Sequence, residues 1–296
     1  MSHFLSRDRL RGTYTAIVTP FARTGEVDYA RFRELIEWQI ACGVDGIVPV
    51  GTTGESPTLS IPEHERVVEA AVEAVAGRCA VIAGTGGNAT SEALELTRHA
   101  LAAGANATLQ VTPYYNRPPN AGLLDHFRAV ADLGLPVVLY NVPARTGREI
   151  PLDIVEKLAE HPAVIGIKEA AGNVDRVSHI VRRCHLPVLS GDDALALPMI
   201  AVGAVGVISV ASNVIPEPMV RLVRAALEGR LDEARRLHLH YHPLFADLFI
   251  ETNPVPVKAA LAMMGRVEET YRLPLCPMMP ANRRTLEATL RSLELL

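Results

Sequence analysis

One lysine carries the chemistry that this sequence suggests most directly. Lys168 closes the apolar run of residues 163–167, and Glu169 and several small residues follow it. An apolar run with β-branched residues fits a parallel strand that is covered on both faces, so Lys168 would stand at a buried carboxyl end. Burial lowers the pKa of an ammonium group. The resulting amine is a nucleophile that can form a Schiff base with a carbonyl substrate.

An alternative interpretation puts Lys168 just beyond the strand with its charge in water, and position alone favours it. Residues at other predicted strand ends argue for the nucleophile instead. Tyr140 ends the preceding strand, where its hydroxyl could move protons to and from a forming imine, although a core aromatic is the commoner role of a tyrosine. Arg145, in the loop that follows, has the forked guanidinium that suits a carboxylate, although a solvated surface charge would explain it too.

A loop rich in glycine and hydroxyl groups, residues 51–55, follows another predicted strand. Its glycines free backbone N–H groups to face an anion. No Gly-Lys-Ser/Thr sequence follows, so the loop is not a P-loop, and a carboxylate is the expected anion. An ordinary turn between a strand and a helix explains this loop equally well when it is considered alone.

Strands and helices alternate along the chain, and about eight strand–helix units can be counted. The predicted strands are residues 13–18, 46–50, 80–84, 107–111, 136–140, 163–168, 187–190 and 206–210. Eight units make a TIM barrel, and the 296 residues are close to the length of about 250 that is typical of one. A doubly wound open sheet would also alternate, but it would not need eight units. We therefore expect a (β/α)8 TIM barrel, in which the carboxyl ends of all strands meet on one face.

Capping residues mark several predicted helices. Ser60 is the expected N-cap of a helix over residues 61–76, with Glu63 completing a capping box. Thr90 or Ser91 is expected to cap the helix that runs to residue 103, and Gly104 ends it. Glycines in similar contexts end two other helices, a faint repeat that supports the barrel.

The pattern changes beyond Pro216, where no further strand is predicted. Helices are expected at residues 219–227, 231–248, 256–264 and 282–293. We therefore divide the chain into a barrel domain, residues 1–224, and a C-terminal helical appendage, residues 225–296. No Ser/Gly-rich linker separates them, so the appendage should pack on the barrel.

Composition excludes some classes of function. The chain is 49% hydrophobic and 21% charged with a net charge of −4, as in soluble globular proteins. It has no basic stripe with interleaved aromatics, which argues against nucleic acid as a partner. The apolar residues 194–211 are long enough to cross a membrane, but Pro198, Gly203 and Gly206 interrupt them. A buried helix and a buried strand explain this segment better than a membrane span.

The cysteines and the N-terminus indicate a cytoplasmic protein. The cysteines form no C-x-x-C pair, so we expect four buried, reduced thiols rather than disulfides or a zinc site. They are Cys42, Cys79, Cys184 and Cys276. Residues 1–9 lack an apolar segment, so no secretory signal is expected.

Two groups of possible metal ligands are weak candidates. His238 and His242 have the i,i+4 spacing of a metal site on one helix face. No glutamate accompanies them, so these residues and His240 are interpreted as surface or packing histidines. Asp192 and Asp193 could bind a metal, but paired acids after a strand more often cap a helix. We therefore expect no metal.

Taken together, these motifs resemble those of the dihydrodipicolinate synthases, also called 4-hydroxy-tetrahydrodipicolinate synthases. The resemblance covers nearly the whole chain. It rests on residues 51–56 (GTTGES), 111–116 (VTPYYN), 140–147 (YNVPARTG), 166–170 (GIKEA), 190–193 (SGDD), 206–210 (GVISV), 253–258 (NPVPVK) and 273–278 (LPLCPM).

The resemblance implies a reaction and a role for each site residue. Lys168 would form a Schiff base with pyruvate, and the enamine would add to L-aspartate 4-semialdehyde, a step towards diaminopimelate and lysine. No cofactor is implied, because the imine itself is the electron sink. Thr53, Tyr140 and Tyr115 would relay protons, with Tyr115 reaching in from a neighbouring subunit. The implied substrate-binding residues are Thr52, Thr53, Arg145, Gly191 and Ile208.

The resemblance also implies a homotetramer, built as a dimer of dimers, and an allosteric lysine site. The matching residues are Ser56, His64, Asn88, Glu92 and Tyr114. Pro57 stands where lysine-sensitive enterobacterial members carry alanine, and Ile61 stands where they carry histidine. An isoleucine cannot replace the hydrogen bonds of a histidine, so lysine inhibition should be weak or absent.

Two other functions compete with the synthase. Sibling aldolases, such as N-acetylneuraminate lyases and keto-deoxy-sugar acid aldolases, share the barrel, the lysine and the tyrosine. The sialate lyases usually carry serine where Thr52 stands and lack an arginine at Arg145, so this pair favours the synthase. A binding or regulatory protein without activity would have lost catalytic residues, yet the implied set is complete here.

Overall fold

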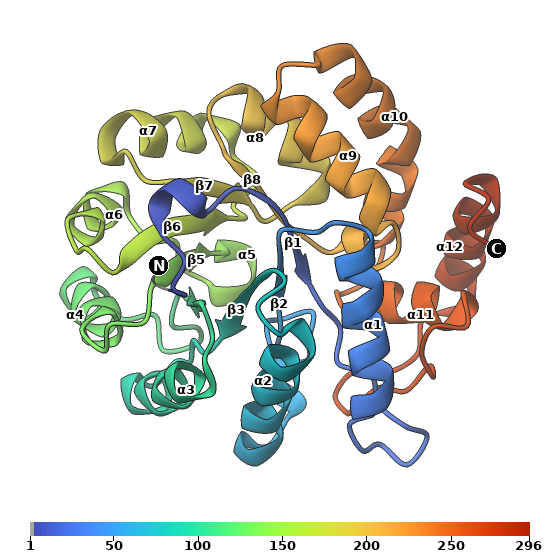
Figure 1. Ribbon diagram of the computed structural model, residues 1–296, viewed down its shortest axis with the longest axis horizontal. Helices are drawn as coiled ribbons and strands as arrows, with labels where there is room; N and C mark the ends of the chain where they lie inside the picture. The colour runs from blue at the N-terminus through green and yellow to red at the C-terminus, as the bar shows by residue number, and fades with distance from the viewer. Residues whose placement is uncertain (1–2) are drawn as a thin grey trace.

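Eight parallel strands close into a barrel in which each strand pairs with the next along the chain and β8 pairs with β1 (Figure 1). They are β1 (Gly12–Ala16), β2 (Gly46–Val48), β3 (Ala80–Gly84), β4 (Ala107–Val111), β5 (Val137–Asn141), β6 (Val164–Glu169), β7 (Val188–Ser190) and β8 (Gly206–Ser209). This computed structural model describes residues 3–296, so Met1 and Ser2 of the N-terminal segment lie outside the described residues. The predicted TIM barrel is confirmed, and the open sheet is wrong.

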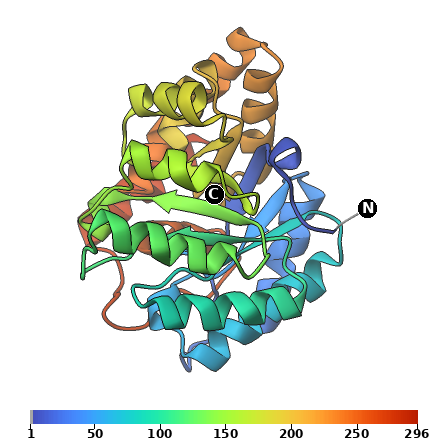
Figure 2. The same cartoon turned by 90° about the vertical axis from the view of Figure 1, so that its left-hand side faces the viewer.

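Helices surround the barrel and cover the outer faces of its strands (Figures 1 and 2). They are α1 (Tyr29–Ala41), α2 (Ile61–Val75), α3 (Thr90–Ala103), α4 (Asn120–Ala131), α6 (Leu152–Ala159), α7 (Val174–Cys184), α8 (Ala196–Ala201) and α9 (Pro216–Leu227). A further short helix, α5 (Pro143–Thr146), was not expected and lies in the loop after β5. The described residues contain no helix that is both long and apolar enough to cross a membrane.

Three more helices form the C-terminal part of the chain: α10 (Leu231–Asp247), α11 (Val255–Met263) and α12 (Pro280–Ser292). Helix α10 packs on α9, while α12 packs on both α10 and α11. Helix α9 itself packs on strands β1 and β8. The proposed boundary between residues 224 and 225 therefore falls inside a helix that covers the barrel, and the division into two domains remains a proposal.

Helix ends follow the expected signals in one case and depart from them in another. The Ser60 side chain accepts a hydrogen bond from the Glu63 backbone, and Glu63 bonds back to the Ser60 N–H, so the capping box of α2 is confirmed. The prediction that Thr90 or Ser91 caps α3 is wrong. Helix α3 begins at Thr90 after Ala89, which provides no side-chain cap. The Thr90 hydroxyl instead lies 3.0 Å from Nδ1 of His126, a bond between neighbouring helices.

Apolar side chains fill the barrel interior towards its amino end. Leu10 and Tyr14 are each 1% exposed and belong to the same interior cluster as Ile82 and Ile165. A Cβ at position 166 would lie 2.3 Å from a methyl carbon of Leu10. Glycine at this position therefore leaves the space in which Leu10 closes the amino end of the barrel. The opening of the barrel is therefore at the carboxyl ends of the strands.

Candidate active site

Lys168 lies within strand β6 and not beyond it. Its register partner on β5 is Tyr140, and Lys168 is only 6% exposed. The Lys168 Nζ lies 4.3 Å from the centre of the Tyr140 ring. A ring face attracts an ammonium group, so the contact holds the lysine in place. The alternative in which Lys168 points into water is wrong.

A buried network after Lys168 fixes strands β5 and β6 against each other. Glu169 is fully buried, and its carboxylate accepts hydrogen bonds from Asn141 Nδ2 at 2.8 Å and from Arg176 Nε at 2.9 Å. The Arg176 side chain is 7% exposed. Hydrogen bonds to a buried charge are strong and directional. They hold the ends of both strands, and so the pair Tyr140 and Lys168, in register.

Gly191 leaves the space that the lysine side chain occupies. A Cβ at this position would lie 2.9 Å from Cε of Lys168 and 2.7 Å from Cβ of Ala170. Real Cβ atoms do not approach other atoms so closely. Glycine at the end of β7 is therefore a requirement of the buried lysine, as well as a predicted substrate-binding residue.

A cavity of about 390 Å³ opens at the carboxyl ends of the strands and brings most of the predicted residues together. Lys168, Tyr140, Thr52, Thr53, Arg145 and Gly191 all line it. Active sites of TIM barrels lie at this end. The wall also includes Phe249, Thr252 and Asn253 from the C-terminal part of the chain, none of which was predicted as a site residue.

Asn253 connects the C-terminal part to two predicted site residues. Its Nδ2 donates a hydrogen bond to Oγ1 of Thr53 at 2.9 Å. Its main-chain oxygen accepts one from Arg145 at 3.2 Å. Oδ1 of Asn253 is buried and has no hydrogen-bond partner among residues 3–296. Only the position of Asn253 directly before Pro254, in a motif of the resemblance, could have drawn attention to it.

Two predicted residues do not reach the cavity in a single chain. Tyr115 is 91% exposed and adopts a left-handed backbone with φ of +69°, which non-glycine residues rarely do. Ile208 is fully buried in the barrel interior, and Val210, two residues later, lines the cavity in its place. Their roles as catalytic and substrate-binding residues remain predictions.

A second cavity of about 390 Å³ lies beside the first and collects most of the predicted lysine site. Ser56, His64, Glu92 and Tyr114 line it, whereas Asn88 does not. Burial lowers the pKa of His64, whose Nε2 lies 2.9 Å from the Gly84 carbonyl oxygen. Burial and the Glu92 carboxylate raise the pKa of Tyr114.

The two cavities share part of one wall. Thr52, Tyr140, Val142 and Arg145 line both of them. Pro57 and Ile61, the two residues that depart from the lysine-sensitive pattern, line only the second cavity. The two cavities are therefore adjacent to each other.

The paired aspartates have structural partners. Asp192 caps the turn that follows it, because its side chain accepts a hydrogen bond from the Ala194 N–H at 3.0 Å. Asp193 accepts hydrogen bonds from the N–H groups of Val210 at 3.0 Å and Ala211 at 2.8 Å. Burial raises the pKa of Asp193 to about 6. The capping interpretation is confirmed for Asp192.

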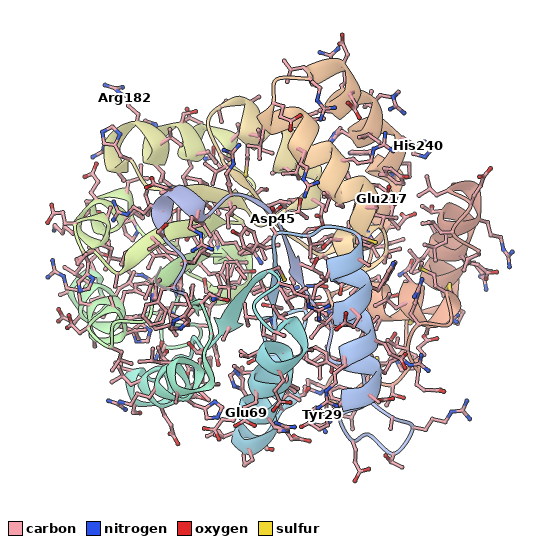
Figure 3. The ribbon with its side chains drawn as sticks, viewed as in Figure 1. Tyr29, Asp45, Glu69, Arg182, Glu217 and His240 are labelled. Atoms are coloured by element: carbon pink, nitrogen blue, oxygen red, sulfur yellow. The ribbon has the colours of Figure 1, made fainter. Side chains whose placement is uncertain are left out.

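The remaining candidates are peripheral. The rings of His238 and His242 lie 5.7 Å apart on α10, and His240 lies at the outer edge of the molecule (Figure 3). No group of three or more possible metal ligands occurs in the described part of the chain. The four cysteines are free, but the expectation that all are buried is wrong. Cys184 alone is buried, Cys42 and Cys79 are half-buried, and Cys276 is exposed, because it lies in an irregular surface segment.

Comparison with known proteins gives a consistent answer. The model of the dihydrodipicolinate synthetase family matches residues 9–293. The chain is 51% identical over 282 residues to 4-hydroxy-tetrahydrodipicolinate synthase of Nitratidesulfovibrio vulgaris strain Miyazaki F, which covers 94% of this chain and 96% of that protein.

Solved structures agree with these relatives. The 4-hydroxy-tetrahydrodipicolinate synthase of Methylacidiphilum fumariolicum is 52% identical, with a TM-score of 0.94 over 97% of each chain. A chloride-inhibited dihydrodipicolinate synthase of Acinetobacter baumannii, complexed with pyruvate, is 41% identical. Its TM-score is 0.95, over 97% of this chain and 100% of that one.

Proposed function

The chain belongs to the dihydrodipicolinate synthetase family, and on that premise we propose that it works as a 4-hydroxy-tetrahydrodipicolinate synthase. It condenses pyruvate with L-aspartate 4-semialdehyde, in the biosynthesis of diaminopimelate and lysine. The observation that carries this assignment is the buried Lys168 at the wall of the first cavity, against the Tyr140 ring. The similarity of about half the residues over nearly the full chain favours this activity over that of the sibling aldolases.

In the proposed mechanism, the Lys168 amine attacks the carbonyl carbon of pyruvate and water leaves, which gives an imine. Loss of a proton from the pyruvate methyl group gives an enamine, because the imine accepts the electron pair. The enamine carbon then attacks the aldehyde of L-aspartate 4-semialdehyde. Finally, the amino group of the second substrate displaces Lys168 and closes the ring. These steps use no metal or organic cofactor.

Proton transfer in these steps is assigned to Tyr140, Thr53 and Tyr115. Tyr140 is next to the lysine and is 7% exposed. Thr53 is 3% exposed at the same cavity. A positioned acid or base of this kind contributes about 10²- to 10⁴-fold to a rate.

The two substrate carboxylates are assigned to different parts of the wall. Thr52, Thr53 and the backbone near them hold pyruvate, with Gly191 and Ile208 at the same end. Arg145 is exposed at the mouth and held by Asn253, so it suits the carboxylate of the second substrate. A guanidinium can bind a carboxylate with two hydrogen bonds.

The assembly we propose is a homotetramer, a dimer of dimers in which Tyr115 serves the site of the neighbouring chain. The 91% exposure of this tyrosine supports the proposal, because an aromatic ring in water gains by burial in a partner. We also infer a cytoplasmic enzyme, since its four cysteines are free thiols, the state that a reducing compartment maintains.

A coupled assay tests the function. Pyruvate and L-aspartate 4-semialdehyde are supplied together with the NADPH-dependent reductase of the next step, and NADPH loss is followed. We expect turnover that is abolished in Lys168→Ala. Arg145→Ala should retain the pyruvate adduct that borohydride traps but lose use of the second substrate. The expected loss is about 10- to 100-fold, since a hydrogen bond to a charged group is worth about 1.5–3 kcal/mol.

The contrary results are distinct. If the wild type traps pyruvate on Lys168 but shows no NADPH loss, the chemistry of the barrel stands and a sibling aldolase with another aldehyde is favoured. If pyruvate forms no adduct at all, the enzyme assignment fails and a binding protein is favoured.

Lysine should inhibit this enzyme weakly or not at all. Ile61, which lines the second cavity, offers no hydrogen bond where sensitive members carry histidine. Millimolar lysine is expected to leave the rate in the coupled assay unchanged, and Ile61→His should increase any response. Strong inhibition of the wild type would refute this proposal.

A further inference from the structure

The segment between β2 and α2, residues 49–60, carries Thr52 and Thr53, and the C-terminal part of the chain holds it at three points. Asn253 bonds Thr53 through the side chains, as described above. Lys258 Nζ lies 2.5 Å from Oε1 of Glu55. Arg272 binds the far end of the segment. Residues that are about two hundred positions apart in sequence therefore meet along one loop.

The pair of Lys258 and Glu55 is unusual because both side chains are fully buried. Phe21 and Tyr271 surround the ammonium group, with ring centres 4.2 and 5.4 Å from Nζ. Burial lowers the pKa of Lys258, and the Glu55 carboxylate opposes that shift. Removing two charges from water often outweighs their attraction, so such a pair adds little stability compared with apolar residues. Stability alone therefore does not account for it.

The backbone at Glu55 gives the pair a local role. Glu55 has φ of +55° and ψ of +35°, the left-handed conformation that is unfavourable for residues other than glycine. A conformation of this kind persists only where the surroundings hold it. The ion pair with Lys258 is the strongest interaction of the Glu55 side chain, and Thr53 lies only two residues before it.

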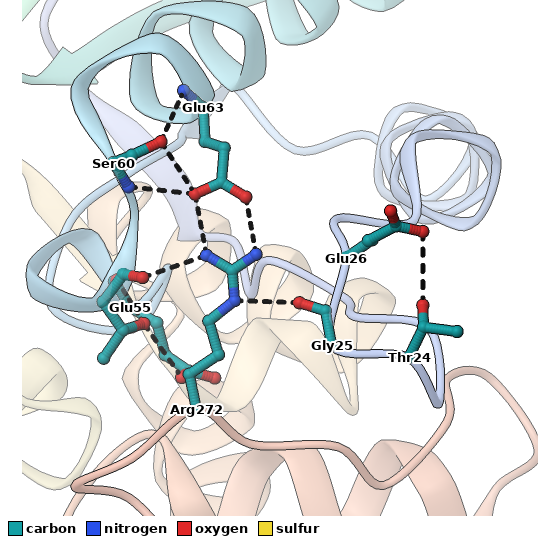
Figure 4. A network of polar contacts seen from close by, with 8 residues as sticks. Thr24, Gly25, Glu26, Glu55, Ser60, Glu63 and Arg272 are labelled. Carbon is teal, nitrogen blue, oxygen red and sulfur yellow. Dashed lines mark hydrogen bonds and ion pairs between the residues drawn. The ribbon is translucent and has the colours of Figure 1, made fainter.

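Arg272 secures the other end of the same segment, as Figure 4 shows. Its guanidinium donates hydrogen bonds to the main-chain oxygen of Thr58 at 2.9 Å and to both carboxylate oxygens of Glu63, at 2.6 and 2.8 Å. It also bonds the Gly25 carbonyl oxygen at 2.9 Å. The start of α2 is therefore fixed, so the conformation of the loop depends on its contacts nearer to Thr53.

Both of those nearer contacts come from α11 and the residues just before it. Asn253 stands just before the helix and Lys258 lies within it. Because the Asn253 Nδ2 donates to Thr53 Oγ1, that oxygen already accepts one hydrogen bond, and the hydroxyl proton is directed elsewhere. Thr53 lines the same cavity as Tyr140 and Lys168, so a hydroxyl proton directed there faces a substrate bound to the lysine.

We propose that Lys258 is a positioning residue for the reaction, which through its buried ion pair with Glu55 holds the 49–60 segment so that Thr53 presents its hydroxyl to the imine on Lys168. This proposal rests on the proposed function, in which Thr53 relays protons. Lys258 itself does not touch the substrate. It sets the geometry of a group that does.

The test uses the double variant Glu55→Gln/Lys258→Met, which removes both charges and leaves neither buried alone. The control is Glu287→Gln/Arg291→Met, an ion pair of 2.8 Å on α12 that touches neither the 49–60 segment nor the surroundings of Lys258. Three quantities are measured on the full-length proteins: pyruvate trapped by borohydride, deuterium exchange from solvent into the pyruvate methyl group, and turnover in the coupled assay. Exchange and turnover are divided by the amount of trapped adduct.

We expect the Glu55/Lys258 variant to trap pyruvate while exchange and turnover per adduct fall by about tenfold or more, because misplacement of a catalytic group by about 1 Å can lower a rate by about 10²-fold. The control should keep wild-type rates per adduct. A merely structural role would reduce the amount of adduct and leave the rates per adduct unchanged, and that result would overturn the proposal.

A milder variant keeps the test decisive if the double variant does not fold. Glu55→Asp retains the charge and shortens the side chain by one methylene, so the segment should shift while the ion pair persists. The exchange rate per adduct should then fall by an intermediate amount; an unchanged rate contradicts the proposal. Should the wild type exchange deuterium but fail with L-aspartate 4-semialdehyde, the proposed function fails while the positioning test remains valid.

Discussion

At the scale of single residues, the burial of charged groups is the main free-energy cost of this active site. Lys168, Glu169, Asp193 and the pair of Glu55 and Lys258 are all withdrawn from water near the carboxyl ends of the strands. Each has specific partners: an aromatic ring, backbone N–H groups or an opposite charge. Buried charges without such partners are strongly disfavoured. The partners therefore fix where each of these groups stands.

Asp193 predicts a dependence of stability on pH. Burial raises its pKa to about 6, above the value near 3.8 of an exposed aspartate. Between about pH 4 and pH 6, the folded chain thus holds a proton that the unfolded chain has lost. The contribution of this group to stability is therefore fullest below about pH 4 and is lost as the pH rises through 6. The size is on the order of 3 kcal/mol, at about 1.4 kcal/mol per pKa unit.

Urea unfolding of wild type and Asp193→Asn at pH 4.5 and pH 7 measures this effect. The variant should gain stability relative to the wild type as the pH rises. Asp232→Asn, at a fully exposed helix position, serves as the control. Equal pH dependence of the wild type and Asp193→Asn would contradict the prediction.

At the scale of elements, the start of α2 predicts a stability effect. Its capping box satisfies two backbone N–H groups, those of Ser60 and Glu63. Ser60→Ala removes the side-chain acceptor and should destabilise the fold by about 1 kcal/mol. Ser91→Ala at the start of α3 should have almost no effect, because Ser91 does not cap that helix. Urea unfolding at one pH compares the two variants; equal losses would show that the capping box adds nothing.

How far the sequence predicts the elements depends on the range of the interactions involved. Gly104 ends α3, and the box of Ser60 and Glu63 begins α2, because these signals act within one turn of helix. Thr90 misled the prediction for the opposite reason. Its hydroxyl bonds His126 on another helix, a tertiary contact that no local pattern reveals.

The site shows the same division. Lys168, Tyr140 and Arg145 stand at or just after strand ends, so the topology of the barrel brings them together. Asn253 was missed, because its partner Thr53 is 200 residues away in sequence. The exposure of Cys276 was missed too, since it depends on how the last irregular segment lies on the surface.

At the scale of the whole molecule, the exposure of Tyr115 predicts that two inactive variants restore each other. Tyr115→Phe lacks a relay group, and Lys168→Ala lacks the nucleophile. In a hybrid dimer of the proposed assembly, one site combines the intact Lys168 of one chain with the intact Tyr115 of the other. Random pairing makes about half of the dimers hybrids with one of two sites complete, so about a quarter of wild-type activity should return.

Co-expression of the two variants followed by the coupled assay measures this recovery. As a control, Tyr115→Phe is co-expressed with Tyr115→Phe/Lys168→Ala, a combination in which no site can be complete. Activity of the first mixture that does not exceed the control would show that Tyr115 does not act across chains.

The closed amino end of the barrel has a consequence for the order of substrate binding and product release. Leu10 and its neighbours fill that end, so substrates reach the cavity from the carboxyl ends of the strands. Arg145 is exposed at the mouth of the cavity, while Lys168 lies at the buried inner wall. A molecule bound at the mouth of the cavity obstructs access to the inner wall. The substrate that bonds to the lysine must therefore bind first. The next turnover starts only after the product has left through the same opening.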